Sequence, residues 1–372
     1  MSTKTLALPT NESAFPSIRC YWRPVILIAA AALILCTFWF WSRYPALVSK
    51  AAHIGKAVPT MTYTSELIAV KADAPIWWQI TATSVNWLNG MKVGMTFGVL
   101  FGSLLHTILR YYPLKVGKNL YINSLKGALI GVPMGVCENC AVPTACGVTR
   151  GNGRVEVALG FLFSSPTFNP VVVAMTFTAF PLLMCITKYL LVAGVIVFVV
   201  PGLISLLERN KTLPALNLGG ACEIPQPQAP KTGSCAEGFF AVFAELLKDF
   251  GRNVWMLLKP TVTLMVLASV LAAALIVLVP WSSLLSEVTP LKAAVVSLLA
   301  VIMPVPIALD VMFPVQLLHQ GIAPGYVMML TSTLGTFSII PAIYLWRDVS
   351  KTLAISLLGF FFIVGWILAM TF

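Results

Sequence analysis

Three cysteines lie close together in an apolar stretch of the chain, GVPMGVCENCAVPTACGVTRG, at residues 131–151. Cys137 and Cys140 are three residues apart, a spacing that puts both thiols on one face of a helical turn. Cys146 follows beyond Pro143. Thiolate is a soft ligand that selects Cu(I) and other thiophilic centres over Mg²⁺ or Ca²⁺. The pattern predicts a site for a thiophilic solute with Cys137 and Cys140 as metal ligands, on which Cys146 could also converge.

A Cys-x-x-Cys pair by itself fits metal binding and redox chemistry equally well. A membrane thiol-disulfide oxidoreductase therefore stays open as an alternative, although the chain has no cysteine after Cys235. A further alternative is an anion permease in which the thiols take no part. Glu138 and Asn139, which stand between the two thiols, are additional candidates for contact with the solute.

The composition places this site in a membrane. Hydrophobic residues make up 58% of the chain, charged residues 10%, and the mean hydropathy is +0.89. In soluble domains about a quarter of the residues are charged. A polytopic all-α membrane protein is predicted, because each spanning backbone group must be satisfied within its own helix. The clearest apolar runs are Val25 to Trp41, Leu182 to Leu207, Thr261 to Val279 and Leu353 to Thr371.

Two internal repeats are indicated by four features that occur twice in the same order: Trp and Lys before an apolar helix, a Pro-x9-Pro segment, a Gly turn, and Thr-Phe followed by Asn or Ser. Nine residues separate Pro133 from Pro143, and nine separate Pro304 from Pro314. The flanking segments also correspond: NWLNGMK at 86–92 with NVWMLLK at 253–259, and SPTFNP at 165–170 with LGTFSIIP at 334–341. We expect the repeats to have inverted topology, with hairpins at residues 122–149 and 291–320 that enter the membrane from opposite sides.

Proline removes a backbone donor and clashes with the preceding helical turn, so each Pro-x9-Pro segment is predicted to be broken or re-entrant. Unpaired backbone at membrane depth is tolerated where it lines a cavity, and paired broken segments mark the substrate site of many transporters. Each half is expected to hold a second broken helix as well. The expected structural breaks are Pro133, Pro143, Pro166, Pro170, Pro304 and Pro314.

Short polar side chains accompany the second pair of breaks. Such side chains can satisfy freed backbone groups or offer oxygens to a ligand. With Glu138 and Asn139, the substrate-binding candidates of this kind are Ser165, Thr167, Asn169, Thr336 and Ser338.

Asp310 is predicted to couple transport to protons. It corresponds to Asn139 in the Pro-x9-Pro register, and an ionisable residue within a membrane segment is by default a functional hypothesis. Glu138 and His319 are secondary candidates for the same role. The alternative is that Asp310 pairs with a basic residue or a backbone amide.

The chain divides into four expected regions. An N-terminal transmembrane helix and its following loop occupy residues 1–84, and permease repeat 1 covers 85–207. A cytoplasmic polar insert with an amphipathic helix covers 208–253, and repeat 2 covers 254–372. The segment EGFFAVFAELLKDFGRNVW, residues 237–255, is expected to lie along the membrane surface. Cys222 and Cys235 in the insert could capture a soft ion.

Parts of the sequence resemble a known group of transporters. The runs GVPMGVCENCAVP, RGNGRVEVALGFLFSSPTFNPVV and DVMFPVQLLHQGIAPGYVMMLTSTLGTFSIIP are similar to the bacterial two-repeat permease family that includes the ArsP-type organoarsenical exporters and YraQ-like predicted permeases. The resemblance covers about residues 85–372 and implies an inner-membrane permease. For the best-studied branch it implies export of trivalent organoarsenicals. Its motifs fall on Cys137, Cys140, Pro143, Ser165, Pro166, Asn169 and Pro170.

We therefore expect a multi-pass permease of the bacterial inner membrane that exports a trivalent arsenical or a soft metal or metalloid and is driven by the proton gradient. Its partners would be the lipid bilayer and a small inorganic or organometalloid solute, with homo-oligomerisation left open. No cofactor and no nucleic acid is expected, because the net charge of +11 suits basic loops beside anionic lipid. The absence of a phosphate-binding loop and of a serine elbow argues against an enzyme.

Overall fold

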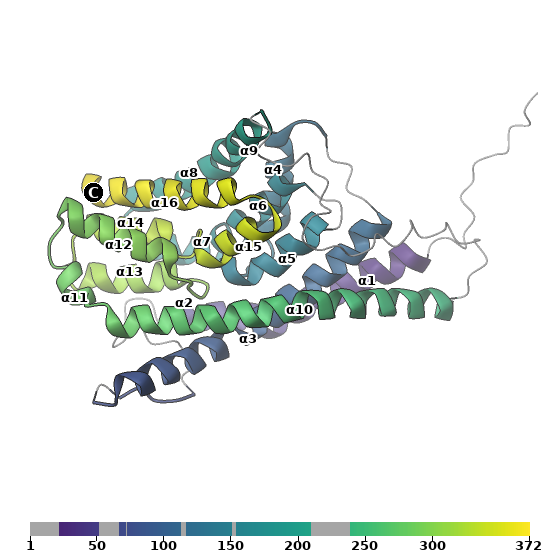
Figure 1. Ribbon diagram of the computed structural model, residues 1–372, viewed down its shortest axis with the longest axis horizontal. Helices are drawn as coiled ribbons and strands as arrows, with labels where there is room; N and C mark the ends of the chain where they lie inside the picture. The colour runs from purple at the N-terminus through teal and green to yellow at the C-terminus, as the bar shows by residue number, and fades with distance from the viewer. Residues whose placement is uncertain (1–21, 52–66, 72, 113–116, 151–153, 210–238) are drawn as a thin grey trace, which may run out of the picture.

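The computed structural model describes residues 22–51, 67–71, 73–112, 117–150, 154–209 and 239–372. These residues form helices joined by short connections, and no strand occurs among them (Figure 1). The predicted all-α class is confirmed in the described part of the chain. Residues 210–238, which carry Cys222 and Cys235, lie outside it.

The N-terminal helix is a single rod with a wider π-helical stretch in its middle. Its parts are α1 (Trp22–Cys36), η2 (Thr37–Arg43) and α2 (Tyr44–Ala51). The long helix α3 (Ile76–Tyr111) follows and packs along α1.

Seven shorter elements complete the first half of the chain. They are α4 (Leu120–Gly131), α5 (Glu138–Arg150), α6 (Val155–Thr167), α7 (Pro170–Ala179), α8 (Leu182–Gly194), η3 (Val195–Val199) and α9 (Val200–Arg209). The last three form one continuous apolar span.

The second half begins with the long helix α10 (Phe239–Leu278). It continues with α11 (Trp281–Leu284), α12 (Pro290–Ile302), α13 (Leu309–His319), α14 (Pro324–Thr333), α15 (Ile339–Asp348) and α16 (Lys351–Thr371). The order of a long helix, two helices around a six-residue break, a second broken pair and a final apolar helix thus occurs in both halves. The breaks after α4 and α12 cover residues 132–137 and 303–308.

Five helices in the described residues are long and apolar enough to cross a membrane. They are Trp22–Ser49, Ile76–Tyr111, Leu182–Arg209, Phe239–Leu278 and Lys351–Thr371. The pair α6 and α7, which bends by 48°, could form a sixth span. The outer faces of the five long helices carry large exposed apolar side chains such as Trp41 and Phe240. Such exposure is expected where lipid takes the place of water. The four apolar runs identified in the sequence fall in helices that are long and apolar enough to span a membrane.

Helices of the two halves interlock at the centre. The long helices α3 and α10 pack along each other, and α5 fits between α3 and α6 (Figure 1). Helix α5 also contacts α15 of the second half, while α13 contacts α7 of the first. Phe163 of α6, Phe337 and Phe361 of α16 form an aromatic cluster with ring centroids 5.7–5.8 Å apart. The core therefore lies at the junction between the halves.

The proline positions differ in part from the prediction. Pro133 and Pro304 lie in the breaks, and Pro170 is the first residue of α7, directly after the bend at residues 168–169. Pro143, Pro166 and Pro314 instead lie inside helices α5, α6 and α13. In each Pro-x9-Pro pair, the backbone is therefore broken at the first proline while the helix passes through the second.

The break residues include backbone conformations with positive φ. Gly135 (φ 59°) lies in the first break, and Ala308 (φ 66°) ends the second, directly before α13. A left-handed conformation is uncommon for alanine and persists only where its surroundings enforce it. Both positions lie in a non-helical segment that joins two helices.

The amphipathic segment expected on the membrane surface is continuous with the next crossing. Residues 239–278 form one helix of 40 residues, and the expected boundary at residue 253 falls inside it. Its first part is held against α1 and α3 by packing around Leu27, Leu104, Val242 and Leu246. Packing on two neighbouring helices therefore covers part of its apolar face, and its place along the membrane surface stays a prediction.

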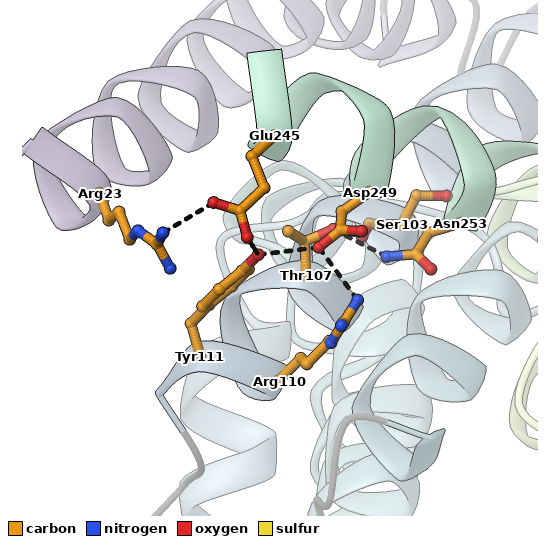
Figure 2. A network of polar contacts seen from close by, with 8 residues as sticks. All are labelled: Arg23, Ser103, Thr107, Arg110, Tyr111, Glu245, Asp249 and Asn253. Atoms are coloured by element: carbon orange, nitrogen blue, oxygen red, sulfur yellow. Dashed lines mark hydrogen bonds and ion pairs between the residues drawn. The ribbon is translucent and has the colours of Figure 1, made fainter. Parts of the chain in front are cut away.

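A polar cluster fixes this end of α10 (Figure 2). Glu245 pairs with Arg23 of α1 at 2.7 Å, and Asp249 pairs with Arg110 of α3 at 3.0 Å. The hydroxyl of Tyr111 donates to Asp249 at 2.8 Å. The cluster ties the N-terminal helix to both long helices and so fixes the position of the rest of that rod.

Candidate functional site

The thiols of Cys137 and Cys140 lie 2.7 Å apart and are buried at the start of α5. Cys137 is the last residue of the first break, and its sulfur accepts the backbone N–H of Cys140 at 3.4 Å. The sulfur thus lies at the N-terminal end of a helix, where the helix dipole favours negative charge. The two cysteines do not form a disulfide. The helical turn predicted from their spacing thus brings them together.

Helix α3 comes close to this pair because it carries glycine where a side chain would collide. A Cβ on Gly94 would lie 2.8 Å from the Cys140 sulfur and 3.2 Å from Nη2 of Arg43. Arg43 comes from η2 in the N-terminal helix and also stacks over the Phe38 ring at 4.9 Å. A guanidinium and a thiol therefore share the space that the bare Gly94 leaves.

Glu138 is fully buried in the first turn of α5, between the two thiols in sequence. Both of its carboxylate oxygens are buried and make no hydrogen bond of good geometry with the described residues, although Ser338 is close. It interacts electrostatically with Cys137 and Asp310. A buried carboxyl group of this kind is costly unless a proton or a ligand satisfies it.

Asp310 forms an ion pair with Lys188, with 2.5 Å between the Lys188 Nζ and the Asp310 Oδ2. Lys188 is fully buried in α8, and Asp310 lies in the first turn of α13. The pair therefore joins the two halves of the chain. Pairing with a basic residue was the alternative considered for Asp310, and it is what the structure contains. Coupling to protons stays a prediction.

Side chains of the first half satisfy the backbone of the second break. Asn139 donates from Nδ2 to the carbonyl oxygen of Val305 at 3.1 Å, and the Trp87 indole donates to that of Pro304 at 3.3 Å. The Ser338 hydroxyl donates to Asn139 Oδ1 at 3.3 Å. Non-helical backbone at membrane depth needs such partners. Asn139 thus connects α5 to both breaks of the second half.

The other polar candidates act mainly on backbone groups. The Ser165 hydroxyl accepts from the Val136 N–H in the first break at 3.3 Å. Asn169 caps α7 through its Oδ1, while its Nδ2 is buried without a partner among the described residues. Thr336 donates to the carbonyl oxygen of Ser332 at 2.9 Å, and Thr167 is buried at the end of α6.

Cys146 lies away from the thiol pair. It is further along α5, where its sulfur contacts Asp348 Oδ2 at 3.7 Å. No group of three His, Cys, Asp or Glu side chains that could hold a metal ion occurs in the described residues. The structure thus does not bring Cys146 to the other two thiols. His319 is exposed at the end of α13 and does not join the buried site.

A pocket is lined by residues of α5, α10 and α15. Asn139, Pro143, Cys146, Pro260 and Arg347 are among the residues that line it. Asn139 is the sequence neighbour of Glu138 in α5. The helical prolines Pro143 and Pro260 bring one lining proline from each half.

A comparison with protein families gives one match that covers most of the chain. Residues 84–372 match the ArsP_1 family, which is described as a predicted permease. The chain belongs to this family. This membership points to a membrane transporter rather than an enzyme, and it confirms the resemblance found in the sequence.

The chain is also 24% identical to the UPF0718 protein YraQ of Escherichia coli (strain K12) over 351 residues. The match covers 91% of each protein. No solved structure matches the chain. The ArsP_1 match begins at residue 84, so Arg43 lies outside the family region. The N-terminal helix places this residue beside the thiol pair.

Sequence reasoning missed two of the charged residues at the centre. Lys188 is the single charged residue between Leu182 and Leu207, and this isolation in an apolar run was the signal that could have identified it. Arg43 gave a weaker signal, because it stands at the end of an apolar run, where basic residues are common in membrane proteins.

Proposed function

We propose that the protein is a permease of the bacterial inner membrane that exports a thiophilic solute, either a trivalent arsenical or a soft metal or metalloid. The observation that carries the proposal is the buried thiol pair Cys137 and Cys140 at a helix break, where elements of both halves meet. Thiols selectively bind soft centres. A pair at the junction of two halves can be exposed to each side in turn when the halves move.

Two repeats of inverted topology would supply that motion. The matching order of elements in the two halves supports this part of the proposal, as do the reciprocal contacts of α5 with α15 and of α13 with α7. In transporters built from inverted repeats, alternating access is largely the rocking of one repeat against the other around a site near the midplane.

Asp310 is the proposed coupling residue, and Lys188 is its counter-ion. Protonation of Asp310 would neutralise the carboxylate and free Lys188 from the ion pair, which links the α8–α13 contact to proton binding. The two residues come from different halves. Proton binding could therefore change how the halves pack, and Glu138 is a second carboxyl group that could exchange protons with this centre.

The thiol-disulfide oxidoreductase remains the second candidate, because two thiols 2.7 Å apart are also placed to form a disulfide. Trapping free thiols with an alkylating reagent in living cells separates the candidates. Cycling of Cys137 and Cys140 through a disulfide would favour the oxidoreductase. An anion permease with inert thiols would use the buried cations Lys188 and Arg43 instead.

A growth experiment tests the proposal. A strain that lacks its own exporters would carry the wild type, Cys137→Ser, Cys140→Ser or the control Cys185→Ser, each at equal membrane level. Cys185 is buried in α8 and donates to a backbone carbonyl, as serine also can. We expect the first two variants to lose resistance to trivalent arsenicals or soft metals and the control to keep it. Full resistance in both variants would exclude a role for the thiols.

A further inference from the structure

A third sulfur atom lies beside the thiol pair. The Met91 Sδ is 3.7 Å from the Cys137 Sγ, and Cys137 is 2.7 Å from Cys140. All three side chains are buried. Met91 comes from α3, one turn before Gly94, so the close approach of α3 to α5 that Gly94 permits also brings the thioether to the thiols.

A thiol can bind both soft metal ions and trivalent arsenicals, whereas a thioether can bind only the metal ions. Thiolate and thioether are both soft ligands, and together they select Cu(I) and similar ions. A trivalent arsenical binds thiols by exchanging its hydroxyl groups for sulfur, and each new bond releases water formed with the thiol proton. A thioether has no proton to give and takes no part in that exchange. Met91 is therefore useful for a metal ion and adds nothing for an arsenical.

Arg43 supplies a charge that the solute must balance. Its Nε is buried and has no hydrogen-bond partner among the described residues, and the titratable groups that interact with it are Cys137 and Cys140. A charge with little access to water is costly unless a group of opposite charge lies near it. Two neutral thiols do not balance it. The guanidinium thus favours a state of the thiol pair that carries one negative charge.

We propose that Met91, Cys137 and Cys140 bind a soft monovalent cation, Cu(I) or Ag(I), as the transported solute, with Arg43 as the counter-charge. This inference rests on the proposed function and narrows its substrate class. The cation and two Cys–SH groups give a bis-thiolate complex with one negative charge, and two protons leave to water. The thioether adds a neutral third ligand. With Arg43, the filled site has no net charge.

Other thiophilic solutes leave Arg43 unbalanced. A divalent ion gives a neutral bis-thiolate complex with the same loss of two protons. An organoarsenical with two hydroxyl groups gives a neutral dithioarsenite and two water molecules. In both cases, the guanidinium stays beside a neutral complex. The charge of Arg43 and the sulfur of Met91 thus point independently to the same class of ion.

Binding measurements on the purified full-length protein test this site. Cu(I) would be supplied anaerobically in competition with a coloured Cu(I) chelator, and phenylarsine oxide would be titrated in parallel. The variants are Met91→Leu, Arg43→Gln and the double variant Cys137→Ser/Cys140→Ser. Met175→Leu is the matched control, because Met175 is equally buried, in α7.

We expect the wild type to bind one Cu(I) per chain and the double cysteine variant to bind none. Loss of a supporting group at a metal site typically costs about 10–100-fold in affinity, and we expect this loss for Met91→Leu and for Arg43→Gln. Met175→Leu should bind as the wild type does. Met91→Leu and Arg43→Gln should keep their affinity for phenylarsine oxide. Such binding would also show that the two thiols are still in place in these variants.

Wild-type Cu(I) affinity in Met91→Leu and Arg43→Gln would overturn the inference. X-ray absorption at the copper edge of the wild-type complex gives a second answer that does not depend on a variant. Three sulfur neighbours agree with the proposal, and two contradict it. Cysteine-dependent arsenical transport without Cu(I) binding would overturn this inference but keep the permease. Cu(I) binding with no transport of any thiophilic solute would instead overturn the proposed function.

Discussion

Lys188 and Asp310 form an ion pair in the protein interior, with 2.5 Å between the lysine nitrogen and a carboxylate oxygen. The two residues belong to α8 and α13, so this contact links the halves of the chain. The side chain of Lys188 is fully buried, and that of Asp310 is 10% exposed. Two buried charges need each other as partners for the protein to fold. The same pair could also change the contact between α8 and α13 when Asp310 binds a proton.

Single substitutions of this pair should destabilise the protein strongly. Removing one partner of a buried ion pair costs about 3–5 kcal/mol, because the other charge stays behind without compensation. We expect that loss for Lys188→Met and for Asp310→Leu, measured by thermal unfolding in detergent. The double variant should recover most of the stability but lose proton-coupled transport. Single variants as stable as the wild type would contradict the account of this pair.

The packing of α3 on α5 should depend on Gly98. A Cβ at this position would collide with the backbone carbonyl oxygen of Cys140, which cannot move without shifting α5. Overpacking typically costs about 1–3 kcal/mol, and we expect Gly98→Ala to reach at least that loss. Gly359 in α16 is the control, since a Cβ there meets nothing within 4 Å. Replacing an open helical glycine by alanine stabilises by roughly 0.5–1 kcal/mol. Equal melting temperatures for the two variants would contradict the close contact.

In the polar cluster between α1, α3 and α10, Asp249 should contribute more to stability than Glu245. Asp249 accepts from Arg110 and Tyr111 and has a side chain 16% exposed, whereas that of Glu245 is 43% exposed. Hydrogen bonds to charged groups contribute about 1.5–3 kcal/mol, and exposed ion pairs about 0–1 kcal/mol. We expect Asp249→Asn to lower the melting temperature more than Glu245→Gln does. A larger effect of Glu245→Gln would show that the outer ion pair carries the contact.

The ends of α10 should lie on opposite sides of the membrane. Helix α10 is an apolar span, so the insert before it and the Trp281–Leu284 segment after it are separated by the bilayer. A cysteine placed at Lys231 should react with a membrane-impermeant reagent from the cytoplasm, and one placed at Ser283 from outside. The experiment needs a background in which Cys20, Cys36, Cys222 and Cys235 are replaced. Labelling at position 231 from outside would reverse the predicted orientation.

The sequence was sufficient to predict the spans and the thiol pair. Apolar runs long enough to cross a bilayer are a direct physical signal, and the three-residue spacing of Cys137 and Cys140 fixes their approach within one helical turn. The surroundings of the thiols depend on tertiary packing instead. Met91 looks like any apolar residue of α3, and only the absence of a side chain at Gly94 brings it and Arg43 to the cysteines.

Two other features also depend on tertiary packing, which the sequence pattern does not give. The continuity of α10 could not be predicted from the sequence. An amphipathic segment has the same residue pattern whether the helix bends at its end or continues straight into a membrane span. The packing of this segment on α1 and α3 determines which of the two forms. Asp310 was recognised from its charge, but its partner Lys188 lies 122 residues away in sequence.

Transport into everted membrane vesicles tests the central claim most directly. Vesicles with the wild type, with Cys137→Ser/Cys140→Ser or with Cys185→Ser would receive an imposed proton gradient and either Ag⁺ or phenylarsine oxide. The account predicts accumulation of a thiophilic solute with the wild type and with Cys185→Ser. With the double variant, accumulation should fall to the level of vesicles without the protein. Wild-type accumulation by the double variant would contradict a transport site built on these thiols.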